Sequence, residues 1–311
     1  MIDRTVQVFS FSELQQGLHR EEFHKCLIEQ GVFYLTQYSM SDLEHQIART
    51  SVMDFFNNSA EEERVSVMTQ TTGIRRGYSK LEAESTAQVT NAGKYTDYSM
   101  CYSMGISDNL FPSEEFKQVW MQYFGQLYQI AKKIAKEALS VVGTYHIDNI
   151  DSFVDCDPVL RFRYFPEVPE DRCAEFQPNR MAPHYDLSIV TLIHQTPCPN
   201  GFISLQYKIG DVFVDLPPLP NALIVMCGAV ATLVSNGNIK APTHRVLAPT
   251  LAQRVGSDRT SSVFFLRPNH DFTVSLPLAK ACGFDTNLTG KQATFKQWIG
   301  TNYVEMMAYK E

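Results

Sequence analysis

Hydrophobic residues in the first half of the chain recur mainly at helical spacing. The clearest stretch is 114–142, where apolar side chains return every three or four positions, the period of an amphipathic helix. We expect this helix to cover one face of a sheet. Further helices are predicted near Ser12, Ser41 and Ser59, because a serine directly ahead of an amphipathic run is typical of a capped helix start.

Two short runs in the same half predict strands instead. Residues 6–10 alternate between polar and apolar side chains, and β-branched and aromatic residues cluster at 31–36 behind a glycine. The interval 69–109 is polar and rich in Gly, Ser, Thr and Tyr, which predicts irregular structure with short strands. Long loops of this kind usually serve a site or stay mobile.

From about residue 159 the pattern changes to short alternating or apolar runs separated by Pro, Gly and Asn. These runs lie at 160–165, 188–193, 202–205, 211–216, 222–226 and 261–265. Many short strands with turn signals between them are typical of a sandwich, a barrel or a jelly roll. The prediction is therefore an α+β protein with a predominantly β core.

The chain of 311 residues is long enough for one large domain or two modest ones. It contains no internal repeat and no low-complexity linker. We therefore expect one composite domain over residues 1–311. Its parts are a helical N-terminal part at about 1–158, a β-rich catalytic core at about 159–275, and a C-terminal helix and tail at about 276–311.

Composition and charge exclude several classes of protein. A net charge of −7 argues against a nucleic-acid partner, which would require a basic face. The first residues lack a signal peptide pattern, and no apolar run is long enough to span a membrane. The seven cysteines form neither a CxxC pair nor a zinc-type spacing, so we expect reduced structural thiols. These features predict a cytoplasmic protein without a membrane partner.

His184 and Asp186 provide the first candidate chemistry. Residues two apart on a strand point to the same face, so both side chains can bind one ion. His244, ahead of another strand-like run, would complete a set of three ligands. Two imidazoles and one carboxylate with open positions opposite suit non-haem Fe(II). The His-x-Asp pattern alone also fits residues that cap or pair within a loop.

Arg259 and Ser261 are again two apart on a predicted strand. Their guanidinium and hydroxyl groups can therefore point together at one carboxylate. The remaining histidines serve as a comparison. Those in polar helical or loop stretches are predicted to be solvated: His19, His24, His45, His146 and His270. His194 has no carboxylate two positions away and ranks below His184 and His244 as a ligand.

The segments 184–188, 244–246 and 259–261 resemble the Fe(II)- and 2-oxoglutarate-dependent oxygenases, in the group that includes isopenicillin N synthase. Longer stretches are similar to the members of this group that expand the penicillin ring. These stretches are 84–88, 98–105, 161–166, 195–202, 259–268 and 299–304. The resemblance covers nearly the whole chain and implies a distorted jelly roll, or double-stranded β-helix, flanked by helices.

The resemblance also implies roles for individual residues. His184, Asp186 and His244 match the iron ligands of the family, and Arg259 with Ser261 matches its anchor for the distal carboxylate of 2-oxoglutarate. The implied cofactors are Fe(II), 2-oxoglutarate as co-substrate, and O2. Apolar residues are expected to wall the cofactor and substrate spaces: Met181, Ile193, Met226, Val263 and Phe265. Position 226 departs from the phenylalanine that we associate with the family, and Met306-Met307-Ala308 replaces an arginine-rich tail.

The implied substrate is a small β-lactam with carboxylates that require cationic partners. The matching arginines are Arg75, Arg76, Arg161, Arg163 and Arg267. Two alternatives stay open, since Arg75 and Arg76 also fit a solvated pair on a loop, and Arg161 and Arg163 also fit structural ion pairs.

The activity that the resemblance implies is the oxidative ring expansion of penicillin N to deacetoxycephalosporin C by a monomeric enzyme, with succinate and CO2 as co-products. One alternative is hydroxylation of deacetoxycephalosporin C to deacetylcephalosporin C, or both steps in one enzyme. A more remote alternative is a metal-binding jelly-roll module without redox turnover.

Overall fold

A computed structural model describes residues 5–70, 75–145, 147–154 and 156–306. The prediction for His146 and the departure at residues 307 and 308 therefore lie outside the described residues. The helices are α1 (Phe11–Gln15), α2 (Arg20–Glu29), α3 (Asp42–Asn58), α4 (Glu61–Ser66), α5 (Thr86–Val89), α6 (Glu114–Val142), α7 (Ile150–Val154), α8 (Ala229–Val234), α9 (Leu276–Ala281) and α10 (Phe295–Met306), with 3-10 turns at Glu170–Arg172 and Leu251–Gln253. The strands are β1 (Val8–Ser10), β2 (Val32–Thr36), β3 (Gly77–Ser79), β4 (Met100–Gly105), β5 (Val159–Phe165), β6 (Asn179–His184), β7 (Val190–Gln195), β8 (Leu205–Ile209), β9 (Val212–Asp215), β10 (Leu223–Cys227), β11 (His244–Leu247), β12 (Arg259–Leu266), β13 (Thr273–Ser275) and β14 (Gln292–Thr294).

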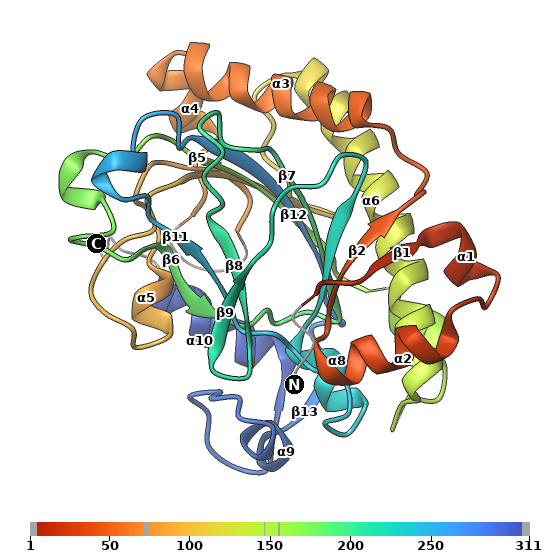
Figure 1. Cartoon of the computed structure of the whole chain (residues 1–311). Coiled ribbons are helices and arrows are strands. Elements are labelled where there is room, and N and C mark those ends of the chain that lie inside the picture. The colour runs from red at the N-terminus through yellow and green to blue at the C-terminus, as the bar shows by residue number, and fades with distance from the viewer. Residues whose placement is uncertain (1–4, 71–74, 146, 155, 307–311) are drawn as a thin grey trace.

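Two sheets form the centre of the molecule (Figure 1). The larger sheet has the strand order β1-β2-β10-β7-β12-β5-β4-β3, and the smaller one has the order β6-β11-β8-β9. Neighbouring strands of both sheets are antiparallel except for the β1–β2 pair. Strands from the N-terminal part of the chain thus extend both edges of a sheet whose middle comes from the later part. The jelly-roll prediction is confirmed.

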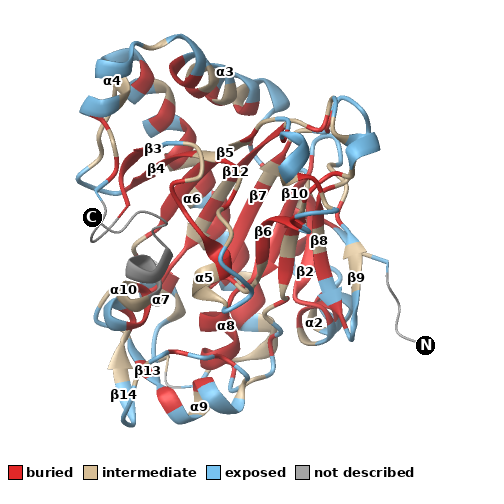
Figure 2. Cartoon of the chain, turned by 90° about the vertical axis from the view of Figure 1, so that its left-hand side faces the viewer, coloured by how far each residue is buried: buried red, intermediate tan, exposed pale blue. Residues whose placement is uncertain are grey.

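Alternation along the strands separates two cores. On β12, Phe264 packs against the rings of Phe124 and Tyr128 on α6, whereas the neighbouring Val263 faces the smaller sheet. Successive side chains on a strand point to opposite faces, so one strand serves both layers. One core lies between the larger sheet and the helices, and the other lies between the two sheets. Figure 2 shows buried residues concentrated on the strands.

The 29-residue helix α6 covers the outer face of the larger sheet, as the sequence predicts. It begins with Ser113, whose side chain accepts a hydrogen bond from the backbone N–H of Phe116. Trp120 is fully buried and packs edge-on against Phe162 of β5. Because burial of a large aromatic side chain removes much apolar surface from water, this contact stabilises the helix on the sheet.

Several predicted boundaries shift by a few residues. The cap of α1 is Ser10 rather than Ser12, and α4 begins behind Ala60 rather than Ser59. The predicted strand at 202–205 is wrong for most of its length, since β8 begins at Leu205. Here Asn200 accepts a hydrogen bond from the backbone N–H of Phe202, which holds the segment in a turn.

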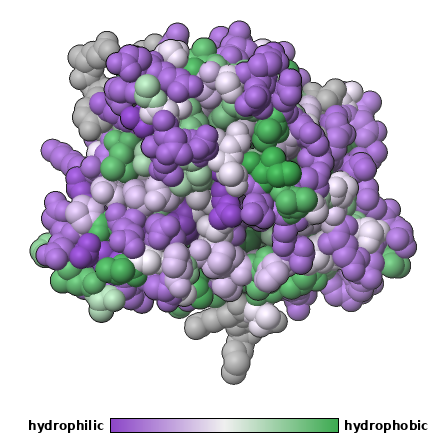
Figure 3. All heavy atoms as spheres, turned by 90° about the horizontal axis from the view of Figure 1, so that it is seen from above, coloured by the Kyte–Doolittle hydropathy of each residue, from purple (hydrophilic) through white to green (hydrophobic). Residues whose placement is uncertain are grey.

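Helices α3 and α4 lie over one end of the larger sheet, at the top of Figure 1. The face that they form is predominantly hydrophilic, with smaller hydrophobic areas (Figure 3). Of the helices that the structure describes, none combines the length and hydropathy needed to cross a membrane.

Candidate functional site

A cavity of about 400 Å³ lies between the two sheets, with α5 and the segment around residue 285 along its mouth. Twelve of the residues predicted from the sequence line it: Arg161, Arg163, Met181, His184, Asp186, Ile193, His244, Arg259, Ser261, Val263, Phe265 and Arg267. The strands explain this convergence. Every second residue of β12 from Arg259 to Phe265, continuing to Arg267 beyond it, faces the cavity, because alternate side chains on a strand share a face.

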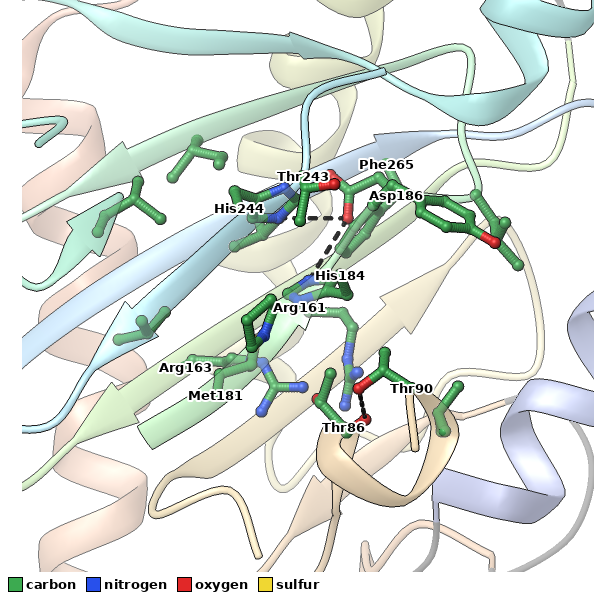
Figure 4. A pocket seen from close by; sticks show the side chains of 18 of the residues that line it. Thr86, Thr90, Arg161, Arg163, Met181, His184, Asp186, Thr243, His244 and Phe265 are labelled. Carbon is green, nitrogen blue, oxygen red and sulfur yellow. Dashed lines mark hydrogen bonds and ion pairs between the residues drawn. The ribbon is translucent and has the colours of Figure 1, made fainter. Parts of the chain in front are cut away.

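His184, Asp186 and His244 form the centre of the site. His184 ends β6 and His244 begins β11, and the register of these antiparallel strands places the two histidines directly opposite each other. Asp186 follows two residues after His184 and turns back toward both rings (Figure 4). Its Oδ1 lies 3.9 Å from His184 Nε2 and 3.7 Å from His244 Nε2.

The hydrogen bonds around these side chains fit a metal ion. His184 Nδ1 lies 2.8 Å from the carbonyl oxygen of Ala182, and His244 Nδ1 lies 3.2 Å from that of Pro242. Donation by Nδ1 leaves each Nε2 as a lone-pair donor that faces Asp186. Asp186 Oδ2 is buried without a hydrogen-bond partner in the described part of the chain. A buried carboxylate oxygen without a partner is costly unless it binds an ion.

The protonation of His184 agrees with this arrangement. Burial, with a further contribution from His244, lowers the pKa of His184 to about 4. The imidazole is therefore neutral at neutral pH, which is the form that binds a metal. The three ligand atoms all lie within 4.8 Å of one another.

Arg259 and Ser261 lie side by side on the same face of β12 and are both buried. The guanidinium of Arg259 donates from Nη2 to Gln195 Oε1 at 2.6 Å, and Gln195 Nε2 donates to the carbonyl oxygen of Leu216 at 2.7 Å. Burial lowers the pKa of Arg259 to about 10, so the group remains a cation at neutral pH. A buried cation beside a hydroxyl is suited to one carboxylate of a ligand in the cavity. Gln195 was not predicted, because a lone glutamine on a strand carries no pattern signal.

Arg161 and Arg163 are adjacent on the cavity face of β5, and both contact Glu84. Arg161 Nη2 lies 2.5 Å from Glu84 Oε1, and Arg163 Nη2 lies 2.7 Å from Oε2. Arg75 Nη1 also approaches Glu84 Oε1, at 3.5 Å. The two readings of Arg161 and Arg163 are therefore compatible, since both arginines form buried ion pairs and both line the cavity. The sequence pattern did not identify Glu84, which lies in an otherwise polar stretch.

Glu84 is only 3% exposed, and burial alone would raise its pKa. The cations of Arg161, Arg163 and Arg75 outweigh burial and hold the pKa of Glu84 well below its ordinary value. The residues after Glu84 form α5, which supplies one wall of the cavity. There Thr86 donates its backbone N–H and its hydroxyl to the buried Asp97, at 3.0 and 2.6 Å.

Three predicted site residues lie elsewhere among the described residues. Arg75 and Arg76 are buried rather than solvated, but neither lines the cavity. Arg76 donates to the carbonyl oxygen of Ser107 at 3.0 Å, so its position is set by backbone contacts. Met226 is fully buried on β10 within the core between the sheets and does not reach the cavity surface. The departure from phenylalanine at this position therefore changes packing behind the wall.

The prediction that His45 is solvated is wrong. His45 is 2% exposed, and its two ring nitrogens lie 2.8 Å from the hydroxyl of Tyr123 and 3.2 Å from that of Tyr38. Its ring stacks on His194 of β7 with centroids 3.8 Å apart. His194 lines a second cavity beneath α3 rather than the one that holds His184. His270, also predicted to be solvated, is half-buried and pairs with Asp157.

Comparisons with known proteins identify the family of the chain. Residues 156–268 match the model of the 2OG-Fe(II) oxygenase superfamily. The chain is 57% identical over 307 residues to deacetoxycephalosporin C synthase of Amycolatopsis lactamdurans, covering 98% of both chains. It is 53% identical over 314 residues to deacetoxycephalosporin C hydroxylase of Streptomyces clavuligerus, covering 100% of this chain and 99% of the relative.

A similar fold occurs in the solved structure of a full-length Neurospora crassa protein in complex with alpha-KG. The TM-score is 0.76 at 20% identity, with 97% of this chain and 98% of the other covered. A match over nearly the whole length at more than half identity, as with the synthase, shows the family. The chain therefore belongs to the 2OG-Fe(II) oxygenase superfamily and is a 2-oxoglutarate-dependent dioxygenase.

Proposed function

We propose that this enzyme catalyses the oxidative ring expansion of penicillin N to deacetoxycephalosporin C. In the balanced reaction, penicillin N, 2-oxoglutarate and O2 give deacetoxycephalosporin C, succinate, CO2 and water, so the penicillin loses two hydrogen atoms. The observation that carries the proposal is one cavity that holds three groups of side chains. They are the His-Asp-His set, the pair Arg259 and Ser261, here called the carboxylate clamp because it suits a ligand carboxylate, and the paired arginines of β5. The 57% identity to deacetoxycephalosporin C synthase supports this choice of substrate.

In this proposal His184, Asp186 and His244 hold Fe(II), while Arg259 and Ser261 bind the far carboxylate of 2-oxoglutarate. When bound, Fe(II) with 2-oxoglutarate and O2 supplies the oxidising power that removes hydrogen from an unactivated carbon. The protein orients the reactants. Because Arg259 is itself held by Gln195, the co-substrate carboxylate would meet a guanidinium whose direction is already set.

The substrate would lie on the arginine side of the cavity. Arg161 and Arg163 are aligned by Glu84, and the guanidinium of Arg267 lies over the Phe265 ring at 5.2 Å. These cations are suited to the carboxylates of penicillin N. Apolar side chains limit water around the reacting carbon: Met181, Ile193, Val263 and Phe265.

A second candidate keeps the cofactors and changes the product. The 53% identity to deacetoxycephalosporin C hydroxylase favours hydroxylation of deacetoxycephalosporin C to deacetylcephalosporin C, alone or in addition to expansion. Both reactions need the same metal set and the same carboxylate clamp. A jelly-roll module without redox turnover would have no use for the buried Arg259 beside Ser261.

Asp186→Ala tests the metal assignment. The variant should lose Fe(II) and form no succinate after anaerobic loading with Fe(II) and 2-oxoglutarate, because one of three ligands is missing. Asp211→Asn, at an exposed turn residue that does not line the cavity, provides the control and should retain both. Normal iron content and succinate formation in the Asp186 variant would contradict the assignment.

Product identity tests the reaction. Wild-type enzyme loaded with Fe(II) and 2-oxoglutarate is incubated with penicillin N and, separately, with deacetoxycephalosporin C, and the products are identified by mass. Ring expansion predicts a product of penicillin N that is two hydrogen atoms lighter. A product only from deacetoxycephalosporin C, heavier by one oxygen atom, would replace expansion with hydroxylation.

We also propose that residues 1–311 act as one composite domain in a cytoplasmic monomer. Support for a single domain comes from the larger sheet, which combines β1 to β4 with β5, β7, β10 and β12. All seven cysteines lie among the described residues and none is in a disulfide, which suits a reducing compartment. Sedimentation of the purified enzyme tests the monomer.

A further inference from the structure

The charged residues that line the cavity come from different elements of the fold. The cations come from β5, β12 and the residue after β12: Arg161, Arg163, Arg259 and Arg267, all buried. Among the described lining residues the carboxylates are Asp186 and Asp285. Asp186 belongs to the His-Asp-His set, whereas Asp285 is exposed and therefore lies at the mouth. The cavity thus has a set of buried cations, here called the cationic floor, and one exposed acidic group, Asp285.

The position of Asp285 is defined by its own loop and by the site. The Asp285 side chain accepts a hydrogen bond at Oδ1 from the backbone N–H of Asn287, at 3.0 Å. Its backbone carbonyl accepts one from the hydroxyl of Tyr185 at 3.3 Å, and the Tyr185 ring packs on Phe284 with centroids 4.7 Å apart. Tyr185 lies between His184 and Asp186 in the chain, so the loop is tied to the centre of the site.

Neutral polar residues surround the same entrance. Thr90 and Asn91, which follow α5, line the cavity together with Asn287. Amide groups can donate to a carboxylate, and a carboxylate such as Asp285 can accept from an ammonium group. A substrate that enters with an amino-acid end outward would find partners for both of its charges at the mouth.

We propose that Asp285 is a specificity-determining residue that binds the α-ammonium group of the substrate side chain. The inference rests on the proposed function, because the side chain of penicillin N ends in an α-amino acid while its ring carboxylate faces the cationic floor. Asp285 then selects penicillins with an ammonium group at the side-chain end over those with a carboxylate alone. The two charged ends of the substrate match the two charged regions of the cavity.

The test is binding to the enzyme loaded anaerobically with Fe(II) and 2-oxoglutarate. Calorimetry measures Kd for penicillin N and for the adipoyl analogue, which lacks only the ammonium group. Wild type should prefer penicillin N by about twofold to fivefold, within the range for one exposed ion pair. Asp285→Asn should remove this preference by weakening penicillin N alone. Asp211→Asn, an exposed aspartate that does not line the cavity, should retain the preference.

Each other outcome has a defined meaning. The role of Asp285 is overturned by any of three results. The wild type shows no preference for penicillin N, the Asp285→Asn variant keeps the preference, or the substitution weakens the binding of both compounds equally. Product masses are scored separately, and deacetoxycephalosporin C carries the same side chain as penicillin N. If the enzyme keeps the preference for the ammonium group but only hydroxylates the cephem, the proposal of ring expansion is wrong. The role of Asp285 is still supported in that case. Absence of binding for both penicillins overturns both proposals.

Discussion

Three guanidinium groups share the carboxylate of Glu84, and two of them face the cavity. The two of them that face the cavity also contact serines. Arg161 Nε donates to Ser103 Oγ at 3.1 Å, and Arg163 Nη1 donates to Ser99 Oγ at 2.9 Å. Buried cations without a partner would repel one another and lose hydration. Glu84 therefore allows a dense cationic surface to exist inside the fold and holds its donors in direction.

Glu84→Gln should lower the free energy of unfolding by about 3 kcal/mol, because it removes the charge that compensates buried guanidinium groups. It should also raise KM for the β-lactam more than it lowers kcat, since Arg161 and Arg163 would lose their alignment. Urea denaturation and steady-state kinetics measure the two effects.

Glu61→Gln is the matched control for this change. Glu61 pairs with Arg64 at 3.0 Å on the surface of α4, so its loss should cost less than about 1 kcal/mol and leave KM unchanged. Equal losses of unfolding free energy in the Glu61 and Glu84 variants would contradict the prediction. They would show that the loss in the Glu84 variant does not come from leaving buried arginines without a compensating charge.

Helix α3 is joined to the larger sheet through a buried stack of imidazoles. His45 on α3 lies over His194 on β7, and Tyr123 on α6 is hydrogen-bonded to His45. Helix α3 begins with a capping box in which Ser41 and Glu44 satisfy each other's backbone N–H groups. Local capping thus defines where the helix begins, and the histidine stack defines how it lies on the sheet.

The stack predicts loss of stability in acid. Burial lowers the pKa of His45 to about 3 and that of His194 to about 4. In the unfolded chain each of these histidines binds a proton near pH 6.5, whereas in the folded protein it stays neutral until the pH is much lower. The free energy of unfolding therefore falls as the pH drops from 6.5 toward 4. Each histidine contributes at most about 1.4 kcal/mol per pH unit within that window.

His45→Gln should therefore reduce the slope of unfolding free energy against pH between 6.5 and 4. Urea denaturation at half-unit intervals of pH measures the slope. His24→Gln, at a half-buried position on α2 outside the stack, provides the comparison, and the slope should fall more in the His45 variant than in this one. An identical slope in wild type and the His45 variant would contradict the role of the stack.

The whole molecule is arranged around the space between its sheets. The larger sheet supplies the carboxylate clamp and the arginines, while β6 and β11 of the smaller sheet supply the two histidines. A ligand in this space contacts both layers at once. Binding to the folded state alone stabilises the fold by mass action, so the cofactors should hold the two sheets together.

Addition of 2-oxoglutarate to the Fe(II)-loaded enzyme at a hundredfold excess over its Kd should raise the free energy of unfolding by about 2.7 kcal/mol. Arg259→Ala should lose this increase at the same concentration and keep the stabilisation by Fe(II), because the clamp and the metal ligands are separate residues. Anaerobic thermal and urea unfolding measure both contributions.

Arg254→Ala provides the control, since Arg254 lies outside the cavity and pairs only distantly with Glu170, at 3.9 Å. It should respond to 2-oxoglutarate as wild type does. Full stabilisation of the Arg259 variant by 2-oxoglutarate would place the co-substrate carboxylate elsewhere.

Much of the fold followed from local patterns. The bounds of α6 match the predicted helix at 114–142, and most predicted strands form within two residues of their expected positions. Periodicity identifies such elements because each side chain's face is set by its immediate neighbours in the chain. The same rule brought Arg259 and Ser261 onto one face of β12, whereas Asp186 lies beyond the end of β6 and turns back toward His184. Boundaries such as the start of β8 depend on single turn contacts and were misplaced.

Residue types and spacing were sufficient to bring together His184, Asp186 and His244, and to pair Arg259 with Ser261, while the resemblance of short segments identified the family. The partners of these residues arise only when distant segments meet. Glu84 contacts Arg161 across 77 positions, and His45 contacts Tyr123 across 78. Burial of Arg75, Arg76 and His45 likewise follows from the layers packed over them, because the cost of removing charge or polarity from water is offset by partners that no local pattern reveals.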